Sequence, residues 1–200
     1  HLLTDQGRGD EAIPRINDLL ATPSEPDLAR EARLLLSGCL RRRACGPDGR
    51  MQESHNEEAR LHFRQLKDAD IAQALQLLTA LERDLFVLEQ ANCLSPVQAD
   101  WLHDCRWGIA DCEFDADHYE SALKLYESLS EIYTDPSEWL EAEVQIANCH
   151  YRVKRVEAAR AVMRAARVRM SQLSDDAVEQ VRIGMSPGRW NEWTEWVRQL

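Results

Sequence analysis

The sequence predicts an all-α protein made of antiparallel helix pairs, a solenoid that ends in a capping helix. Apolar residues recur at intervals of three and four along nearly the whole chain, whereas the period-two alternation of strands is almost absent. Only 8 of the 200 residues are glycine and 7 are proline, and the abundant alanine, leucine, glutamate and arginine are good helix formers. A third observation, an internal repeat, predicts how the helices pair.

Prolines and short polar residues predict where individual helices begin. Four prolines stand at expected helix starts, where a missing N–H costs least, and Ser95 and Ser186 precede two of them as N-caps. We expect helices over residues 10–21, 26–43, 53–67, 70–90, 96–115, 118–133, 137–152, 155–172, 175–183 and 187–199.

The internal repeat has a period of 37 residues, which places residues 109–129 over 146–166. Isoleucine, alanine, cysteine, glutamate and a second alanine coincide in the two segments. A weaker copy of the repeat lies upstream. Its first part, residues 31–40, matches residues 141–150, and its second part, residues 57–66, matches residues 157–166 if ten extra residues are allowed between the two parts. Because the extra segment contains two glycines and a proline, we predict an inserted loop over residues 43–53.

Two helices per unit, a small residue inside the first helix, and an alanine followed four residues later by a large apolar residue resemble the tetratricopeptide repeat (TPR). The resemblance implies a TPR-like superhelix of stacked helix pairs. The sequence departs from the family pattern in its longer period and in Asp117 and Lys154, which replace the usual glycine. The residues that carry the resemblance are Leu36, Ser37, Ala59, Phe63 and Leu66, then Ile109, Ala110, Ala122 and Tyr126, and then Ile146, Ala147, Ala159, Met163 and Ala166.

The repeat also predicts how the chain is organised. We expect N-terminal TPR-like helices that start in the middle of a repeat, a connecting long helix, two TPR-like repeats, and C-terminal capping helices. In the same order, these segments are residues 1–68 with the inserted loop, 69–94, 95–173 and 174–200.

Charge and hydropathy narrow the classes of partner. The 24 Lys and Arg against 35 Asp and Glu give a net charge of −11, which argues against nucleic acid as a partner. No apolar run is long enough to span a bilayer, so we expect no membrane insertion by this chain and a cytoplasmic location. Because the sequence begins with His1, a targeting or membrane segment could precede it.

The six cysteines are expected to be free thiols rather than disulfides or metal ligands. Three of them recur at one position of the repeat and a fourth stands at another small position, which is typical of core packing. We expect no catalytic residue, metal or cofactor, because the adjacent Cys149 and His150 point about 100° apart on a helix. The four core cysteines are Cys39, Cys105, Cys112 and Cys149, whereas Cys45 and Cys93 are expected in loops.

The TPR resemblance implies a concave groove, lined by the first helix of each unit, that binds an extended peptide. Aromatic residues between carboxylates suit a ligand with apolar and basic side chains. The alternative is that the three aromatic residues only pack between units. The matching groove positions are Asp104, Trp107, Asp111, Phe114, Asp115, Val144, Asn148, Tyr151, Arg152 and Arg41.

The function that we expect is a non-enzymatic scaffold for a peptide or protein partner. The alternatives are a homotypic assembly module, giving a homo-oligomer, or an accessory domain of a larger membrane-anchored or multidomain protein. Assembly would use a second surface, made of arginines and tryptophans. The alternative is that these arginines form a solvated convex face and these tryptophans only cap the solenoid. That surface comprises Arg160, Arg164 and Arg167 on one helix and Trp190, Trp193 and Trp196 on the last.

Overall fold

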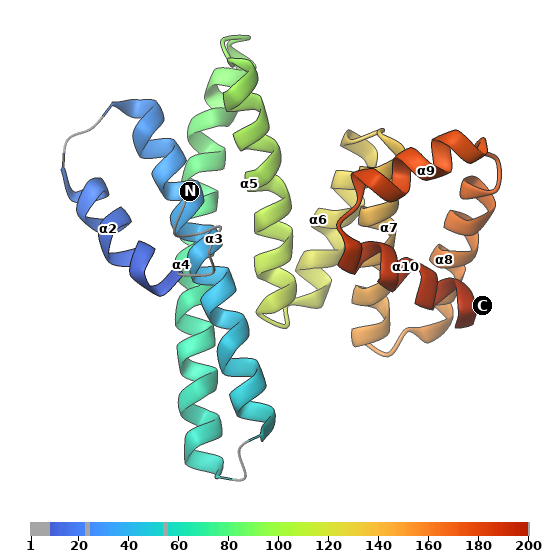
Figure 1. Ribbon diagram of the computed structural model, residues 1–200, viewed down its shortest axis with the longest axis horizontal. Helices are drawn as coiled ribbons and strands as arrows, with labels where there is room; N and C mark the ends of the chain where they lie inside the picture. Colours follow the sequence, from blue (N-terminus) through green and yellow to red (C-terminus); the bar gives the residue numbers. More distant parts are fainter. Residues whose placement is uncertain (1–8, 23–24, 54–55, 200) are drawn as a thin grey trace. The chain divides into compact units, whose positions relative to one another are not determined.

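The computed structural model describes residues 9–22, 25–53 and 56–199, and over these ranges all regular structure is helical. Consecutive helices lie side by side in antiparallel pairs within each part of the chain (Figure 1). The predicted all-α fold of paired helices is therefore confirmed. The helices are α2 (Gly9–Ala21), α3 (Pro26–Glu53), α4 (Glu57–Gln90), α5 (Pro96–Asp115), α6 (Tyr119–Ile132), α7 (Pro136–Arg152), α8 (Val156–Met170), α9 (Asp175–Gly184) and α10 (Pro187–Gln199).

The chain divides into two compact units between Ala116 and Asp117. In the N-terminal unit, α3 packs against α2 and α4, and α4 packs against α5. Its core is made of leucines such as Leu36, Leu78 and Leu81. In the C-terminal unit, α7 packs against α6, α8, α9 and α10. This division falls inside the segment 95–173 that the sequence predicts as two repeats.

The prediction of a loop over residues 43–53 is wrong, because α3 continues as a helix to Glu53. The expected break between residues 67 and 70 is also absent, so the predicted boundary at 68 and 69 lies inside α4. A tertiary contact lies next to both of these positions. Arg43 donates from Nε to Asp70 Oδ2 (2.7 Å) and from Nη2 to Oδ1 (2.6 Å), and the adjacent Ala44 is buried. This contact joins α3 to α4 at the start of the predicted loop and just after the predicted break.

Capping residues fix the starts of several helices as predicted. The hydroxyl of Ser95 accepts from the backbone N–H of Gln98, whose side chain accepts from the Ser95 N–H, forming a capping box. The Ser174 hydroxyl accepts from the backbone N–H of Ala177 at the start of α9, and the Ser186 hydroxyl accepts from the backbone N–H of Arg189 at the start of α10. These local signals explain why α5, α9 and α10 begin close to their predicted positions.

Residues that are equivalent in the repeat have equivalent burial. The paired alanines and cysteines of α5 and α7 are fully buried, as are Ala122 of α6 and Ala159 of α8. The residues that follow α5 and α7 also match, because Asp117 has φ 63° and Lys154 has φ 66°. This left-handed conformation is the one that glycine adopts without steric cost. The 37-residue repeat is therefore present in backbone shape as well as in sequence.

A close approach at the end of α9 fixes where the chain turns into α10. A Cβ atom placed on Gly184 would lie 2.7 Å from Ser137 Oγ and 2.9 Å from Ser137 Cβ, at the start of α7. Real Cβ atoms do not approach other heavy atoms so closely, so only glycine fits at this position. Gly184 therefore lets α9 end directly against α7.

We predict that Gly184→Ala lowers the free energy of unfolding by about 1–3 kcal/mol, because the new methyl group overlaps Ser137. Urea denaturation followed by circular dichroism measures this change. Gly188→Ala is the matched control, since a Cβ there meets no atom within 4 Å, and it should be neutral or stabilise by up to about 1 kcal/mol. In a Ser137→Gly background the cost of Gly184→Ala should disappear, and an unchanged cost would contradict the proposed contact.

Candidate functional site

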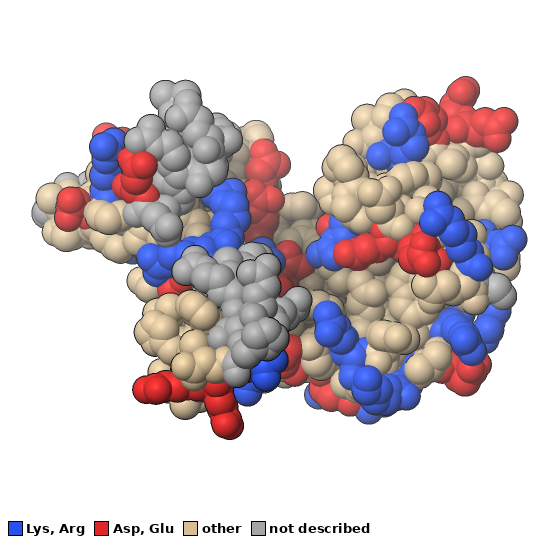
Figure 2. All heavy atoms as spheres, turned by 60° about the horizontal axis from the view of Figure 1, so that its bottom comes forward, with Lys and Arg blue, Asp and Glu red and all other residues tan. Residues whose placement is uncertain are grey.

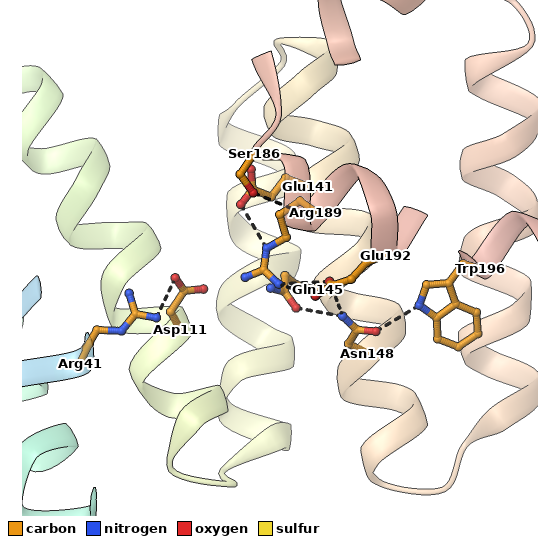
Figure 3. Close-up of polar contacts among 9 residues, drawn as sticks. All are labelled: Arg41, Asp111, Glu141, Gln145, Asn148, Ser186, Arg189, Glu192 and Trp196. Atoms are coloured by element: carbon orange, nitrogen blue, oxygen red, sulfur yellow. Dashed lines mark hydrogen bonds and ion pairs between the residues drawn. The ribbon is translucent and has the colours of Figure 1, made fainter. Parts of the chain in front are cut away.

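One face of α7 carries three polar side chains, and α10 lies across that face. Glu141, Gln145 and Asn148 follow one another at intervals of four and three residues, which places them in one row along the helix. Figure 3 shows this row directed toward Arg189, Glu192 and Trp196 of α10. The last helix therefore occupies the part of α7 that the sequence predicts as a peptide-binding groove.

Arg189 is the centre of the contact between the two helices. Its Nε atom lies 3.3 Å from Glu141 Oε1, and its Nη1 atom lies 3.2 Å from Glu192 Oε2. Gln145 is only 1% exposed, and its amide lies between the Arg189 guanidinium and the Asn148 amide (Figure 3). Because a buried amide needs hydrogen-bond partners, this arrangement favours one position of α10 on α7.

Both polar atoms of the Asn148 side chain form hydrogen bonds with α10. Its Oδ1 atom accepts a hydrogen bond from Trp196 Nε1 at 3.1 Å, and its Nδ2 atom donates to Glu192 Oε2, also at 3.1 Å. The resemblance implies that an asparagine at this position contacts a bound peptide. In this structure the contacts of Asn148 are with its own C-terminal helix.

The prediction that Val144 lines a groove is wrong. Val144 is fully buried and packs in the core that includes Leu140, Ala147 and Met163. The reason is that α7 has neighbours on several sides, so its apolar residues face other helices. The predicted groove residue Arg152 lies with its guanidinium carbon 5.8 Å from the centre of the Tyr119 ring, a distance typical of a cation–π contact.

Beyond Asn148, the surface opens into a hollow of about 280 Å³ between α7 and α10. Tyr151 is 51% exposed, and its ring meets the Trp196 ring edge-on with the centroids 5.9 Å apart. The hollow therefore combines aromatic rings with carboxylates and amides, which are groups that bind peptides. Its lining residues are Asn148, Tyr151, Glu192, Glu195, Trp196 and Gln199.

The sequence prediction missed the residues that α10 contributes to this hollow. Glu192 and Glu195 stand on either side of Trp193, which is buried against α7 and α8. A signal for them is present in the sequence, because Arg189, Glu192 and Trp196 follow one another at intervals of three and four. This spacing predicts a polar edge on a helix whose other residues pack as a cap.

The remaining predicted groove residues lie in the N-terminal unit, where Arg41 brings two of them together. Arg41 Nη2 lies 3.0 Å from Asp111 Oδ2 (Figure 3). The same atom lies 3.2 Å from Asp115 Oδ2. These two carboxylates are therefore paired with a cation of their own unit. Trp107 and Phe114 are half-buried, and the exposed Asp104 lies beside His103.

The Asp115 carboxyl group has a raised pKa. Burial disfavours its charged form, whereas the Arg41 guanidinium opposes this effect and the neighbouring Asp111 adds to it. Arg41 therefore offsets part of the cost of burying the Asp115 carboxylate next to Asp111.

The second surface is only partly accessible. Arg160, Arg164 and Arg167 are exposed on α8, and Arg160 pairs with Glu157 at 2.9 Å. On α10, Trp193 is buried, whereas Trp190 and Trp196 are half-buried against the same core. The tryptophans therefore cap the unit, and the arginines remain at its surface.

The cysteine predictions are confirmed where the structure describes the side chains. Cys39, Cys105, Cys112 and Cys149 are buried free thiols, and Cys93 is exposed between α4 and α5. Burial raises the pKa of the thiols at 105, 112 and 149 to about 12, so these groups stay protonated at neutral pH. Cys45 is in α3 rather than in a loop, and its side chain lies outside the described residues.

Over the described ranges, no three His, Cys, Asp or Glu side chains are grouped so as to hold a metal ion. Among the same residues, none of the helices has both the length and the apolar character needed to cross a membrane. Comparison of the chain with models of protein families, with curated proteins and with solved structures gave no match. The function of the chain is therefore inferred from its own geometry.

We predict that Arg189→Met lowers the free energy of unfolding by about 1–3 kcal/mol, because Glu141 loses its partner and buried Gln145 loses a polar neighbour. Chemical denaturation of the full chain measures the loss. Arg182→Met is the matched control, since Arg182 pairs with Glu179 on an exposed helix surface, and its stability should equal that of the wild type. Equal stability of the two variants would contradict the central position of Arg189.

We also predict that Arg41→Met raises the pKa of Asp115 further above the ordinary value of about 3.9. Burial and Asp111 then raise this pKa with only the weaker effect of Lys67 opposing them. A carboxyl group with a raised folded pKa stabilises the fold most below its unfolded pKa, and this contribution declines as the pH rises through the folded pKa. The variant should therefore be least stable at neutral pH and recover toward about pH 4.

Carbon-13 NMR titration of the carboxyl group measures the pKa of Asp115, and thermal unfolding at several pH values measures the recovery. Arg42→Met changes the adjacent exposed arginine and should leave the titration of Asp115 unaltered. An unchanged Asp115 titration in Arg41→Met would contradict the assignment.

Proposed function

We propose that the protein is a non-enzymatic scaffold that binds a peptide or protein partner in the hollow between α7 and α10. The observation that carries this proposal is the exposed Tyr151 ring beside Trp196, in a hollow edged by Glu192 and Glu195. Exposed aromatic rings next to polar groups are typical of protein-binding sites. The polar row of α7 supports the same proposal, because it already holds one helix by specific hydrogen bonds.

The chemistry of the hollow favours a partner segment that presents a lysine or arginine next to an apolar residue. A cation gains energy over the Tyr151 ring and from the nearby carboxylates. Glu195 pairs with Arg198 at 3.0 Å, but both side chains are more than half exposed. Such surface pairs contribute little, so a partner cation can replace Arg198 at Glu195.

The position of the hollow explains how α10 can close the solenoid and serve binding at the same time. Arg189 and Trp193 fix the helix to α7 and to the core. Trp196, one turn further along, has one edge against Asn148 and the other beside Tyr151. The same helix therefore covers the polar row of α7 and shapes the surface that remains open.

We predict that an array of short peptides screened with the full chain selects sequences with Lys or Arg beside an apolar residue. Tyr151→Ala should weaken the best peptide about tenfold, because the aromatic contact is lost, and Glu195→Gln should weaken it less. Fluorescence polarisation measures the dissociation constants.

Phe86→Ala serves as the matched control, because Phe86 is 43% exposed and belongs to the N-terminal unit. This variant should bind the selected peptide as the wild type does. The proposal fails if binding is unchanged by both Tyr151→Ala and Glu195→Gln, or if the array selects acidic peptides.

A further inference from the structure

The outer face of α8 combines a basic edge with an apolar strip. The arginine edge consists of Arg160, Arg164 and Arg167, all exposed. Arg164 and Arg167 form no ion pair with any residue that the structure describes, although the chain has 35 acidic residues. Beside this edge run the exposed residues Ala161, Ala165 and Val168, and Val168 is 59% exposed.

The outer face of α6 has the complementary pattern. Its glutamate edge consists of Glu120, Glu127 and Glu131, all exposed, with the exposed Lys124 among them. Beside the edge lie the small residues Ser121 and Ser128 and the exposed Ile132, which is 52% exposed.

The charges of the glutamate edge are only partly balanced within the chain. Glu120 pairs with Arg155, but the carboxylates of Glu127 and Glu131 have no cation among the described residues. Burial raises the pKa of Glu143 on α7, and the nearby Glu127 raises it further against the opposing effect of Arg169. An additional cation at Glu127 would therefore relieve a local excess of negative charge.

The two helices cannot satisfy each other within one unit, because each packs against α7. Figure 2 shows both basic and acidic side chains at the surface of the C-terminal unit on the visible face. Both edges are thus available at the surface for contact with a second molecule.

The order of the residues around each helix decides how two such faces fit. On both α6 and α8, the small-residue strip follows the charged edge in the same rotational sense, as the spacing of 3.6 residues per turn requires. If the helices run antiparallel, the two charged edges meet on one side and the two strips meet on the other. In a parallel arrangement the arginine edge would lie against the serine strip instead.

The antiparallel register also matches along the helix axis. Arg160 and Arg164 are four residues apart, as are Glu127 and Glu131. Arg160 then lies opposite Glu131, and Arg164 lies opposite Glu127. Arg167 lies opposite Lys124, so the first two pairs carry the electrostatic attraction. Small side chains in the two strips allow the helix backbones to approach closely.

We propose that the protein self-associates by docking α8 of one copy, antiparallel, on α6 of a second copy. This surface is separate from the hollow at Tyr151, so the inference goes beyond the proposed function. Opposite charges specify the register, and the small-residue strips supply the contact area. Two copies can form the contact twice in a symmetric dimer, or once per copy in an open chain.

Sedimentation velocity of the full chain at about 50 mM and about 500 mM NaCl tests the proposal, because salt screens exposed charges. We expect association at low salt that weakens at least tenfold at high salt. Arg160→Glu/Arg164→Glu and Glu127→Arg/Glu131→Arg should each weaken association at low salt at least tenfold. The chain that carries all four substitutions should associate again, as should an equimolar mixture of the two double variants.

The matched control is Arg182→Glu/Arg198→Glu, which changes the net charge by the same amount at exposed arginines of α9 and α10. It should associate as the wild type does, and Tyr151→Ala should also leave association unchanged. All substituted side chains are exposed, and circular dichroism confirms that each variant is folded.

Three results would overturn the proposal. The first is a wild-type chain that stays monomeric at low salt up to about 1 mM. The second is a fourfold variant that does not regain association. The third is loss of binding to a single-stranded DNA oligonucleotide in Arg160→Glu/Arg164→Glu without any change in self-association, since the arginine edge would then serve an anionic ligand. None of these results depends on whether a peptide binds at Tyr151.

Discussion

The arrangement of the C-terminal unit depends on contacts around α7. Four other helices pack against it, and its small buried residues Ala142, Ala147 and Cys149 allow them to approach. Because the apolar faces of α7 are covered in this way, only its polar row and its C-terminal end are left. α10 takes the polar row through Arg189 and Trp196, so the open hollow forms where α7 ends, beside Tyr151.

Much of the fold could be predicted from local chemistry. The helices α5, α7, α9 and α10 begin at prolines or at capping residues such as Ser95 and Ser174, whose hydrogen bonds involve only neighbouring residues. The continuous helices α3 and α4 could not be predicted in this way. The contact between Arg43 and Asp70 joins residues that are far apart in the sequence, and local signals such as glycine and proline point to a loop instead.

The site was predictable only in part, for a similar reason. Alignment of the repeats places Asn148 and Tyr151 on one side of α7, as the structure does. The alignment does not show what covers the last helix pair, so it could not predict that α10 engages Asn148. It also placed Val144 at the surface, although the number of neighbours around α7 decides its burial. In the N-terminal unit, the pairing of Arg41 with two aspartates depends on contact between α3 and α5.

The left-handed backbone at Asp117 and Lys154 has a consequence for how repeats of this kind are found. Lysine at φ 66° carries a steric cost of about 1 kcal/mol that glycine does not. Around Lys154, α7 packs against α8, so the backbone shape persists there although lysine stands where glycine would be favoured. A sequence pattern that requires glycine at this position would reject both 37-residue repeats. A comparison of backbone dihedral angles would instead group the two repeats together.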